Sequence, residues 1–138
     1  YKLIENLLPD QVNPGYDFTN ARFEGVLPAI EAAPRTVREA YHRMRRPPRY
    51  ELYDLRSDPY EFRNLAASDQ HRAVFKDLKE RLAMWREQTR DPLLDPASLE
   101  LLTAEVNSIR SKKAAKKHRW GYPDYFFGKQ PEGKKGKQ

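Results

Sequence analysis

Apolar residues recur at two different spacings along the first half of this chain, and the spacing separates expected strands from expected helices. Residues 2–8 and 50–55 are short runs of aromatic and aliphatic residues, typical of strands. Between them, a helix is predicted from about Pro34 to Arg45, because one stripe follows the i, i+3, i+4, i+7 pattern. That stripe consists of Val37, Ala40, Tyr41 and Met44. The pattern predicts two paired strands separated by a helical excursion.

The region between the first strand and this helix gives a weaker signal. Asn13-Pro14-Gly15 is a strong turn sequence. Residues 16–33 contain apolar positions at helical spacing, but Pro28 stands inside the pattern. Because proline interrupts a helix interior, two short pieces are expected there.

The longest helix is predicted to begin near Ser68 or Asp69 and to end near Gln88. Its apolar stripe is Val74, Phe75, Leu78, Leu82 and Trp85. Such a stripe favours packing against the sheet, and we expect Trp85 to be a core anchor rather than a ligand platform.

A further helix is predicted after Asp95-Pro96, with Asp95 as its N-cap. Its apolar positions are Leu99, Leu102, Val106 and Ile109. The lysine-rich residues 111–117 are expected to extend this helix, because cations suit the negative end of the helix dipole.

The segment Tyr50–Ala66 combines a strand with capping chemistry. Asp58 has the features of an N-cap, Pro59 those of the first helical residue, and Glu61 stands three residues after the cap. The segment therefore predicts a strand, a tight turn and a short helical turn. Its acids are better explained as caps than as calcium ligands, since calcium takes six to eight oxygens.

The same segment, ending in Asn64-Leu65-Ala66, resembles the C-terminal signature of the sulfatases. Residues 1–16 and 85–92 resemble neighbouring blocks of the heparan N-sulfatase (sulfamidase)-like and arylsulfatase-like members, so the resemblance covers roughly residues 1–106. It implies an α+β fold. A small antiparallel sheet would pack against a long amphipathic helix, with further helices and a flexible basic C-terminal tail.

Family resemblance also implies a chemistry that this chain does not carry. Sulfatases hydrolyse sulfate esters or sulfamates with a formylglycine made from a Cys/Ser-x-Pro-x-Arg motif and with a bound calcium, both in a large N-terminal domain. The chain has no Cys, and none of its serines stands in such a motif. It also begins on an apolar run without Met. We therefore expect a C-terminal subdomain that lacks its catalytic domain, with no catalytic or metal-binding residues of its own.

That resemblance suggests a partner, a location and a candidate substrate rim. The expected partner is the missing N-terminal catalytic domain, and the parent's expected location is periplasmic, secreted or lysosomal. Asn13, Tyr16, Arg22 and Arg43 are candidates for the rim of the substrate cleft, since arginine suits bidentate contact with sulfate or carboxylate. The alternative is that these four are ordinary surface or interdomain residues.

Charge divides the chain at about residue 109. Residues 110–138 hold ten Lys or Arg and two acids, whereas residues 1–109 hold 16 bases and 18 acids. We therefore expect a nearly neutral subdomain over residues 1–109 and a basic, partly disordered tail over residues 110–138. No apolar run approaches the length that spans a membrane.

The tail leaves a second function open. Residues 120–127 contain five aromatics in eight positions beside the lysine run. A stand-alone module that binds a polyanion, such as a sulfated polysaccharide, is the alternative to a sulfatase subdomain. Nucleic acid is a less favoured partner, because no recognisable nucleic-acid motif accompanies the tail and the rest of the chain is slightly acidic.

Overall fold

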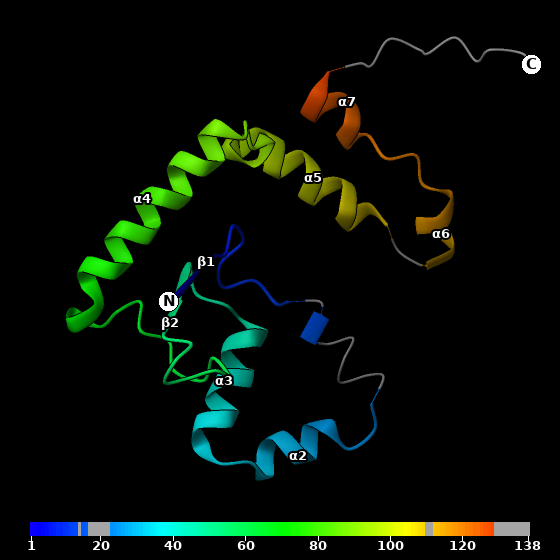
Figure 1. The fold of residues 1–138 in the computed structure, drawn as a ribbon. Helices are drawn as coiled ribbons and strands as arrows, with labels where there is room; N and C mark the ends of the chain where they lie inside the picture. The colour runs from blue at the N-terminus through cyan, green and yellow to red at the C-terminus, as the bar shows by residue number, and fades with distance from the viewer. Residues whose placement is uncertain (14, 17–22, 110–111, 129–138) are drawn as a thin grey trace, which may run out of the picture. The chain divides into compact units, whose positions relative to one another are not determined.

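The computed structural model describes residues 1–13, 15–16, 23–109 and 112–128 of the chain (Figure 1). These residues divide into two compact units, residues 1–81 and residues 82–138. The boundary falls inside one helix, α4 (Arg72–Gln88). The described fold is α+β, as expected, with a small antiparallel sheet and several helices.

The sheet of the first unit pairs β1 (Lys2–Glu5) with β2 (Tyr50–Tyr53) in antiparallel register. Leu3 lies opposite Leu52, which is fully buried. Both strands are shorter than the sequence predicted. One further backbone bond joins Asn6 to Arg49, and the ladder then reaches Pro47-Pro48, which have no N–H to donate. At the other end of β2, Asp54 opens a turn.

Two helices connect the strands. Helix α2 spans Val26–Ala32 and helix α3 spans Arg35–Arg45, which confirms the predicted helix at 34–45. The expected break at Pro28 is wrong. Pro28 is the third residue of α2, where the backbone N–H has no partner within the helix and its loss costs little.

Helix α4 follows a short 3-10 turn, η1 (Asp69–His71), and confirms the long helix predicted from the sequence. Within the first unit it packs on the sheet. The ring of Phe75 meets that of Tyr50 edge-on with centroids 5.5 Å apart, and Lys79 Nζ lies 4.7 Å from the centroid of the Tyr50 ring.

Trp85 is not a core residue, contrary to expectation, because 59% of its surface is exposed. The neighbouring Arg86 is buried instead. Its Nε donates to Asp91 Oδ2 over 2.7 Å and its Nη2 donates to the Leu93 carbonyl over 3.0 Å. The chain that continues through η2 (Pro92–Leu94) therefore contacts the side of α4 that carries Arg86.

In the second unit, α5 spans Pro96–Ser108, α6 spans Lys112–Lys117 and α7 spans Tyr122–Phe127. The Asp95 carboxylate accepts from the backbone N–H groups of Ala97 and Ser98, which confirms the predicted cap. The lysine run does not extend α5, because Ile109 has extended backbone angles and α6 begins separately. Within the described residues, no helix is both long and apolar enough to cross a membrane.

Candidate functional site

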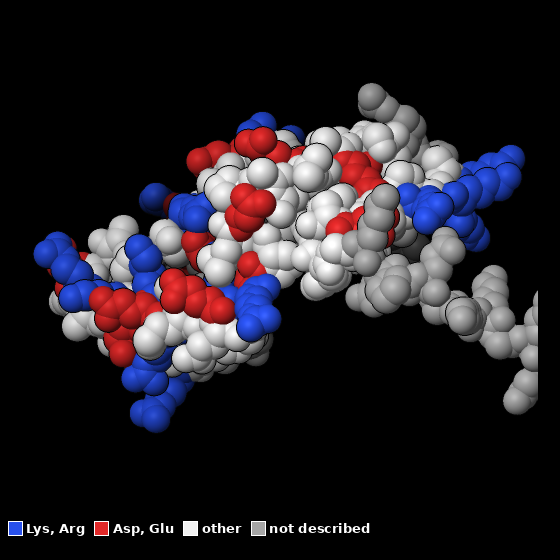
Figure 2. All heavy atoms as spheres, turned by 90° about the horizontal axis from the view of Figure 1, so that it is seen from above, with Lys and Arg blue, Asp and Glu red and all other residues white. Residues whose placement is uncertain are grey.

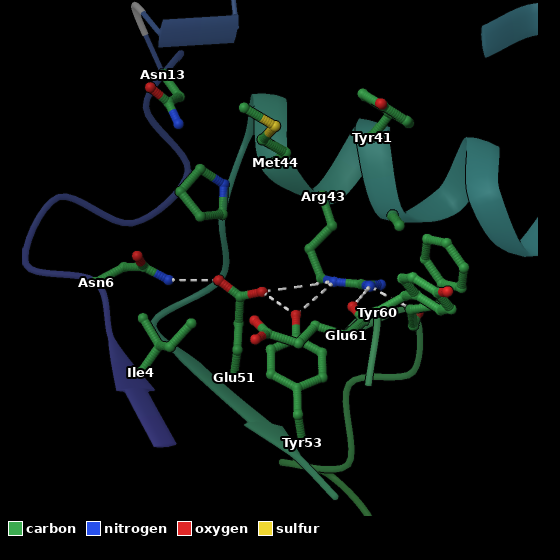
Figure 3. A pocket seen from close by; sticks show the side chains of 13 residues that line it. Ile4, Asn6, Asn13, Tyr41, Arg43, Met44, Glu51, Tyr53, Tyr60 and Glu61 are labelled. Atoms are coloured by element: carbon green, nitrogen blue, oxygen red, sulfur yellow. Dashed lines mark hydrogen bonds and ion pairs between the residues drawn. The ribbon is translucent and has the colours of Figure 1, made fainter. Parts of the chain in front are cut away.

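A pocket of about 410 Å³ opens in the first unit (Figure 3). It is formed by β1, α3, β2 and the segment that follows β2. Its polar wall carries Arg43, Glu51 and Tyr53, with the amides of Asn6 and Asn13 nearby. The remaining lining includes the apolar or aromatic side chains Ile4, Ala40, Tyr41, Met44, Pro47, Tyr60 and Phe62.

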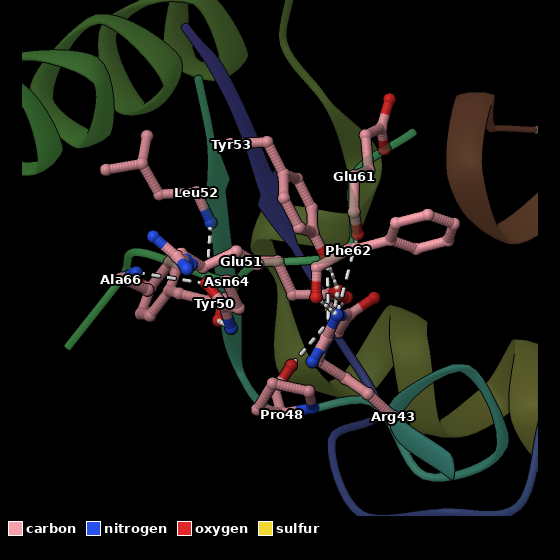
Figure 4. A network of polar contacts seen from close by, with 12 residues as sticks. Arg43, Pro48, Tyr50, Glu51, Leu52, Tyr53, Glu61, Phe62, Asn64 and Ala66 are labelled. Atoms are coloured by element: carbon pink, nitrogen blue, oxygen red, sulfur yellow. Dashed lines mark hydrogen bonds and ion pairs between the residues drawn. The ribbon is translucent and has the colours of Figure 1, made fainter. Parts of the chain in front are cut away.

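Arg43 is at the centre of the polar wall and is mostly buried, with 18% of its side chain exposed. Its Nη2 donates to the Phe62 carbonyl over 2.8 Å. Its Nε lies 3.3 Å from the Tyr53 hydroxyl and 3.6 Å from Glu51 Oε2. One guanidinium therefore connects α3 to β2 and to the segment after β2 (Figure 4).

Glu51 and Tyr53 complete this network from the same side of β2. The Tyr53 hydroxyl donates to Glu51 Oε2, and Asn6 Nδ2 donates to Glu51 Oε1 over 2.9 Å. Burial, followed by the hydrogen bond to Glu51, raises the pKa of Tyr53 to about 12. Neither residue was predicted as part of a site, although their i, i+2 spacing places both on one side of a strand.

Two of the four rim candidates meet at this pocket. Asn13 and Arg43 both line it. Tyr16 is buried, and its ring lies 5.9 Å from the Arg45 guanidinium carbon. Arg22 falls outside the described residues. A substrate contact by any of these residues stays a prediction.

Asn13 has a structural role in the turn that the sequence predicted. Its Oδ1 accepts from the Gly15 N–H over 2.9 Å, and its own backbone N–H donates to the Arg45 carbonyl over 2.8 Å. The turn therefore fastens the chain after β1 to the end of α3.

The expected helical turn at Asp58 is absent. Asp58 accepts from the backbone N–H groups of Phe62 at 3.0 Å and Arg63 at 2.7 Å, four and five residues ahead. Asp58, Pro59 and Glu61 therefore form a capped loop. Glu61 adopts the left-handed conformation, with φ of 59°, and its carboxylate pairs with Lys2 instead of reaching back to Asp58. The acceptor role of Asp58 was predicted correctly, but the helix was not.

The side chain of Asn64 pairs with the backbone of β2 on the edge that β1 does not occupy. Its Oδ1 accepts from the Leu52 N–H at 2.9 Å, and its Nδ2 donates to the Tyr50 carbonyl at 3.1 Å (Figure 4). Leu65 adds a backbone bond to the Leu52 carbonyl at 2.7 Å. These bonds satisfy the edge of β2 that faces away from β1, which would otherwise leave polar backbone groups unpaired.

A second polar cluster holds the described part of the tail together. Glu105 on α5 accepts from the Gly121 N–H, from His118 Nε2 at 2.8 Å and from the Tyr125 hydroxyl at 2.8 Å. These bonds, with the Gly121 N–H contributing most, lower the pKa of Glu105 to about 2. Loss of water contact and the hydrogen bond to Glu105 raise the pKa of Tyr125 to about 12.

Tyr53 and Tyr125 are expected to ionise about two pH units above the usual tyrosine pKa of 10. Since their folded pKa values are raised, the stability they contribute is complete below pH 10 and is lost as pH rises toward 12. Ultraviolet titration of tyrosinate absorbance checks this. Tyr53→Phe and Tyr125→Phe should each remove one late-titrating group. A single transition near pH 10 for all tyrosines would contradict both networks.

The described residues offer few groups for catalysis. Ser68 Oγ lies 2.9 Å from His71 Nδ1, but His71 also meets the Tyr1 ring edge-on, and the acid nearest in sequence, Asp69, pairs with Arg72. Among these residues, no group of three or more His, Cys, Asp or Glu could hold a metal ion. The polar side chains around the pocket are bonded to one another and to the backbone.

Comparison with known proteins supports a resemblance to the sulfatases, the class indicated by the Tyr50–Ala66 motif. The chain is similar to human N-sulphoglucosamine sulphohydrolase, with 29% identity over 100 residues. The match covers 67% of this chain but 19% of the human protein, so the chain corresponds to about a fifth of that relative. No family model and no solved structure matches the chain.

Proposed function

We propose that this chain is the non-catalytic C-terminal subdomain of a sulfatase-type hydrolase, whose complete form removes sulfate from a sulfated carbohydrate. The observation that carries the proposal is the similarity to about a fifth of human N-sulphoglucosamine sulphohydrolase. The two blocks with specific motif residues, Tyr50–Ala66 and the turn at Asn13, are also the parts that organise the first unit.

The motif residues Asp58 and Asn64 stabilise the fold of this chain. The side chains of Asp58 and Asn64 are bonded to backbone groups. A group that must bind and release substrate needs some unsatisfied bonding capacity, and these groups have most of theirs occupied. The proposed role is therefore to complete the fold of the hydrolase and to present a preformed surface.

The pocket of the first unit is the proposed rim of the substrate cleft. Tyr60 is 76% exposed and stacks on Phe62 with ring centroids 5.7 Å apart, which gives a flat apolar surface. Asn13 and Arg43 add amide and guanidinium groups to the lining. An apolar pocket with a few polar groups is the usual form of a small-molecule site, and a sugar ring suits such a lining.

The complete enzyme is proposed to use calcium and a formylglycine. Both would lie in the N-terminal catalytic domain, and the Cys/Ser-x-Pro-x-Arg motif from which formylglycine is made does not occur in this chain. Formylglycine would provide the nucleophile, and calcium would polarise the sulfate group. The residues of this chain would shape the surface around that centre.

The proposal is tested by measuring sulfate release from a sulfamate and from a sulfate ester. The complete gene product is expected to release sulfate, and the 138-residue chain alone is expected to release none above background. Hydrolysis by the chain alone would show that its description as non-catalytic is wrong.

A further inference from the structure

The cations of α6 differ from those of the other described helices. On α3 and α4 most charged pairs are local, as in Arg35–Glu39, Lys76–Glu80 and Arg81–Asp77. In contrast, Lys113, Lys116, Lys117 and Arg119 are all exposed, and none of them forms an ion pair with another described residue. Figure 2 shows Lys and Arg side chains in several groups, and the blue spheres at the right of the view have no red spheres among them. The charge of these four residues is available to an external anion.

Helical geometry places the three lysines together. Lys113, Lys116 and Lys117 stand at i, i+3 and i+4, so they share one face of α6. Residues 112–128 contain five Lys or Arg and one Asp, a net charge of +4 with His neutral. Concentrated charge of one sign raises the local concentration of an oppositely charged polymer.

The aromatic residues that follow α6 in sequence are ordered by the Glu105 cluster. The Trp120 ring contacts His118 edge-on at 4.9 Å and lies 6.0 Å from Tyr122. Glu105 fixes both ends of this run through His118 and through Gly121 and Tyr125. Glu105 therefore orders the segment that follows the lysines in sequence.

We propose that the lysine face of α6, with Arg119 and Trp120, is a binding surface for a sulfated polysaccharide. The choice of polymer rests on the proposed function, since the complete protein would act on sulfated carbohydrate. Single-stranded nucleic acid is the competing polyanion, because bases stack on exposed rings and Trp120 and Tyr122 are each 38% exposed. Its binding is therefore one outcome of the test.

The test measures binding of a heparin oligosaccharide to the full 138-residue chain by calorimetry at low and at physiological salt. The Lys113→Gln, Lys116→Gln, Lys117→Gln triple variant should bind about 10-fold more weakly or worse, since each surface charge contributes a fraction of a kcal/mol up to about 1. The matched control is the Arg72→Gln, Lys76→Gln, Arg81→Gln variant, which loses three cations that are already paired. Its affinity should stay within about twofold. Circular dichroism establishes that both variants fold.

Three outcomes would overturn the inference: no binding of the oligosaccharide, an equal loss in both triple variants, or binding of a single-stranded oligonucleotide at least as tightly as the sulfated oligosaccharide. A chemically desulfated oligosaccharide should bind much more weakly. No turnover is measured, so the result is separate from the proposed function. If sulfate is released by the complete protein but the oligosaccharide does not bind here, this surface alone is rejected.

Discussion

Replacing Arg43 with methionine is expected to lower the free energy of unfolding by about 3–5 kcal/mol, the usual cost of removing one partner from a buried ion pair. The loss arises because Glu51, with 12% of its side chain exposed, would keep its charge without the guanidinium. The Phe62 carbonyl would also lose its donor. Urea denaturation followed by far-UV circular dichroism measures the change.

Two further variants isolate the cause. Arg35→Met removes an arginine from the same helix whose pair with Glu39 is exposed, and it should cost far less than Arg43→Met. The double variant Arg43→Met, Glu51→Gln also removes the unpaired carboxylate charge of residue 51, so it should recover part of the lost free energy of unfolding. If the Arg43→Met variant is as stable as the Arg35→Met variant, the bonds of Arg43 to Glu51, Tyr53 and the Phe62 carbonyl do not stabilise the fold.

Asn64→Ala is expected to cost about 2–4 kcal/mol, because it strands the buried Leu52 N–H and removes the donor to the Tyr50 carbonyl. The same denaturation experiment applies, and hydrogen exchange at the Leu52 amide should become faster. Asn107→Ala is the control, since Asn107 is exposed on α5. Unchanged exchange at Leu52 would mean that Asn64 does not complete the sheet edge.

Features that depend on neighbours in sequence were predictable. Helix α3 followed from its apolar stripe, α4 from its stripe and length, and α5 from the Asp95-Pro96 start. Asp58 was correctly read as an acceptor for backbone N–H groups. Each of these depends on bonds or contacts that span no more than one or two helical turns.

Features that depend on distant partners were not predictable. The loop at Asp58 replaces a helical turn because Glu61 turns into the left-handed region and pairs with Lys2, 59 residues away. Trp85 is exposed because the Asp91–Leu93 segment forms its hydrogen bonds with the adjacent Arg86 instead. Glu105 attracted no attention in the sequence, since its three partners lie 13 to 20 residues further along the chain.

The candidate pocket shows the same division. Arg43 and Asn13 could be named from residue type and motif, and both line the pocket. Glu51 and Tyr53 were not named, because the i, i+2 spacing shows that they share one side of β2 but does not show that Arg43 of α3 contacts that side. Arg43 was therefore predicted from the sequence, but Glu51 and Tyr53, which contact its guanidinium, were not.

The most direct test of the central claim is inorganic sulfate released by the product of the complete reading frame that encodes this chain. We predict release from a sulfamate or a sulfate ester of a carbohydrate, dependence on a Cys/Ser-x-Pro-x-Arg residue outside these 138 residues, and no release by the 138-residue chain alone. A complete product that lacks this motif and releases no sulfate from either substrate would contradict the account.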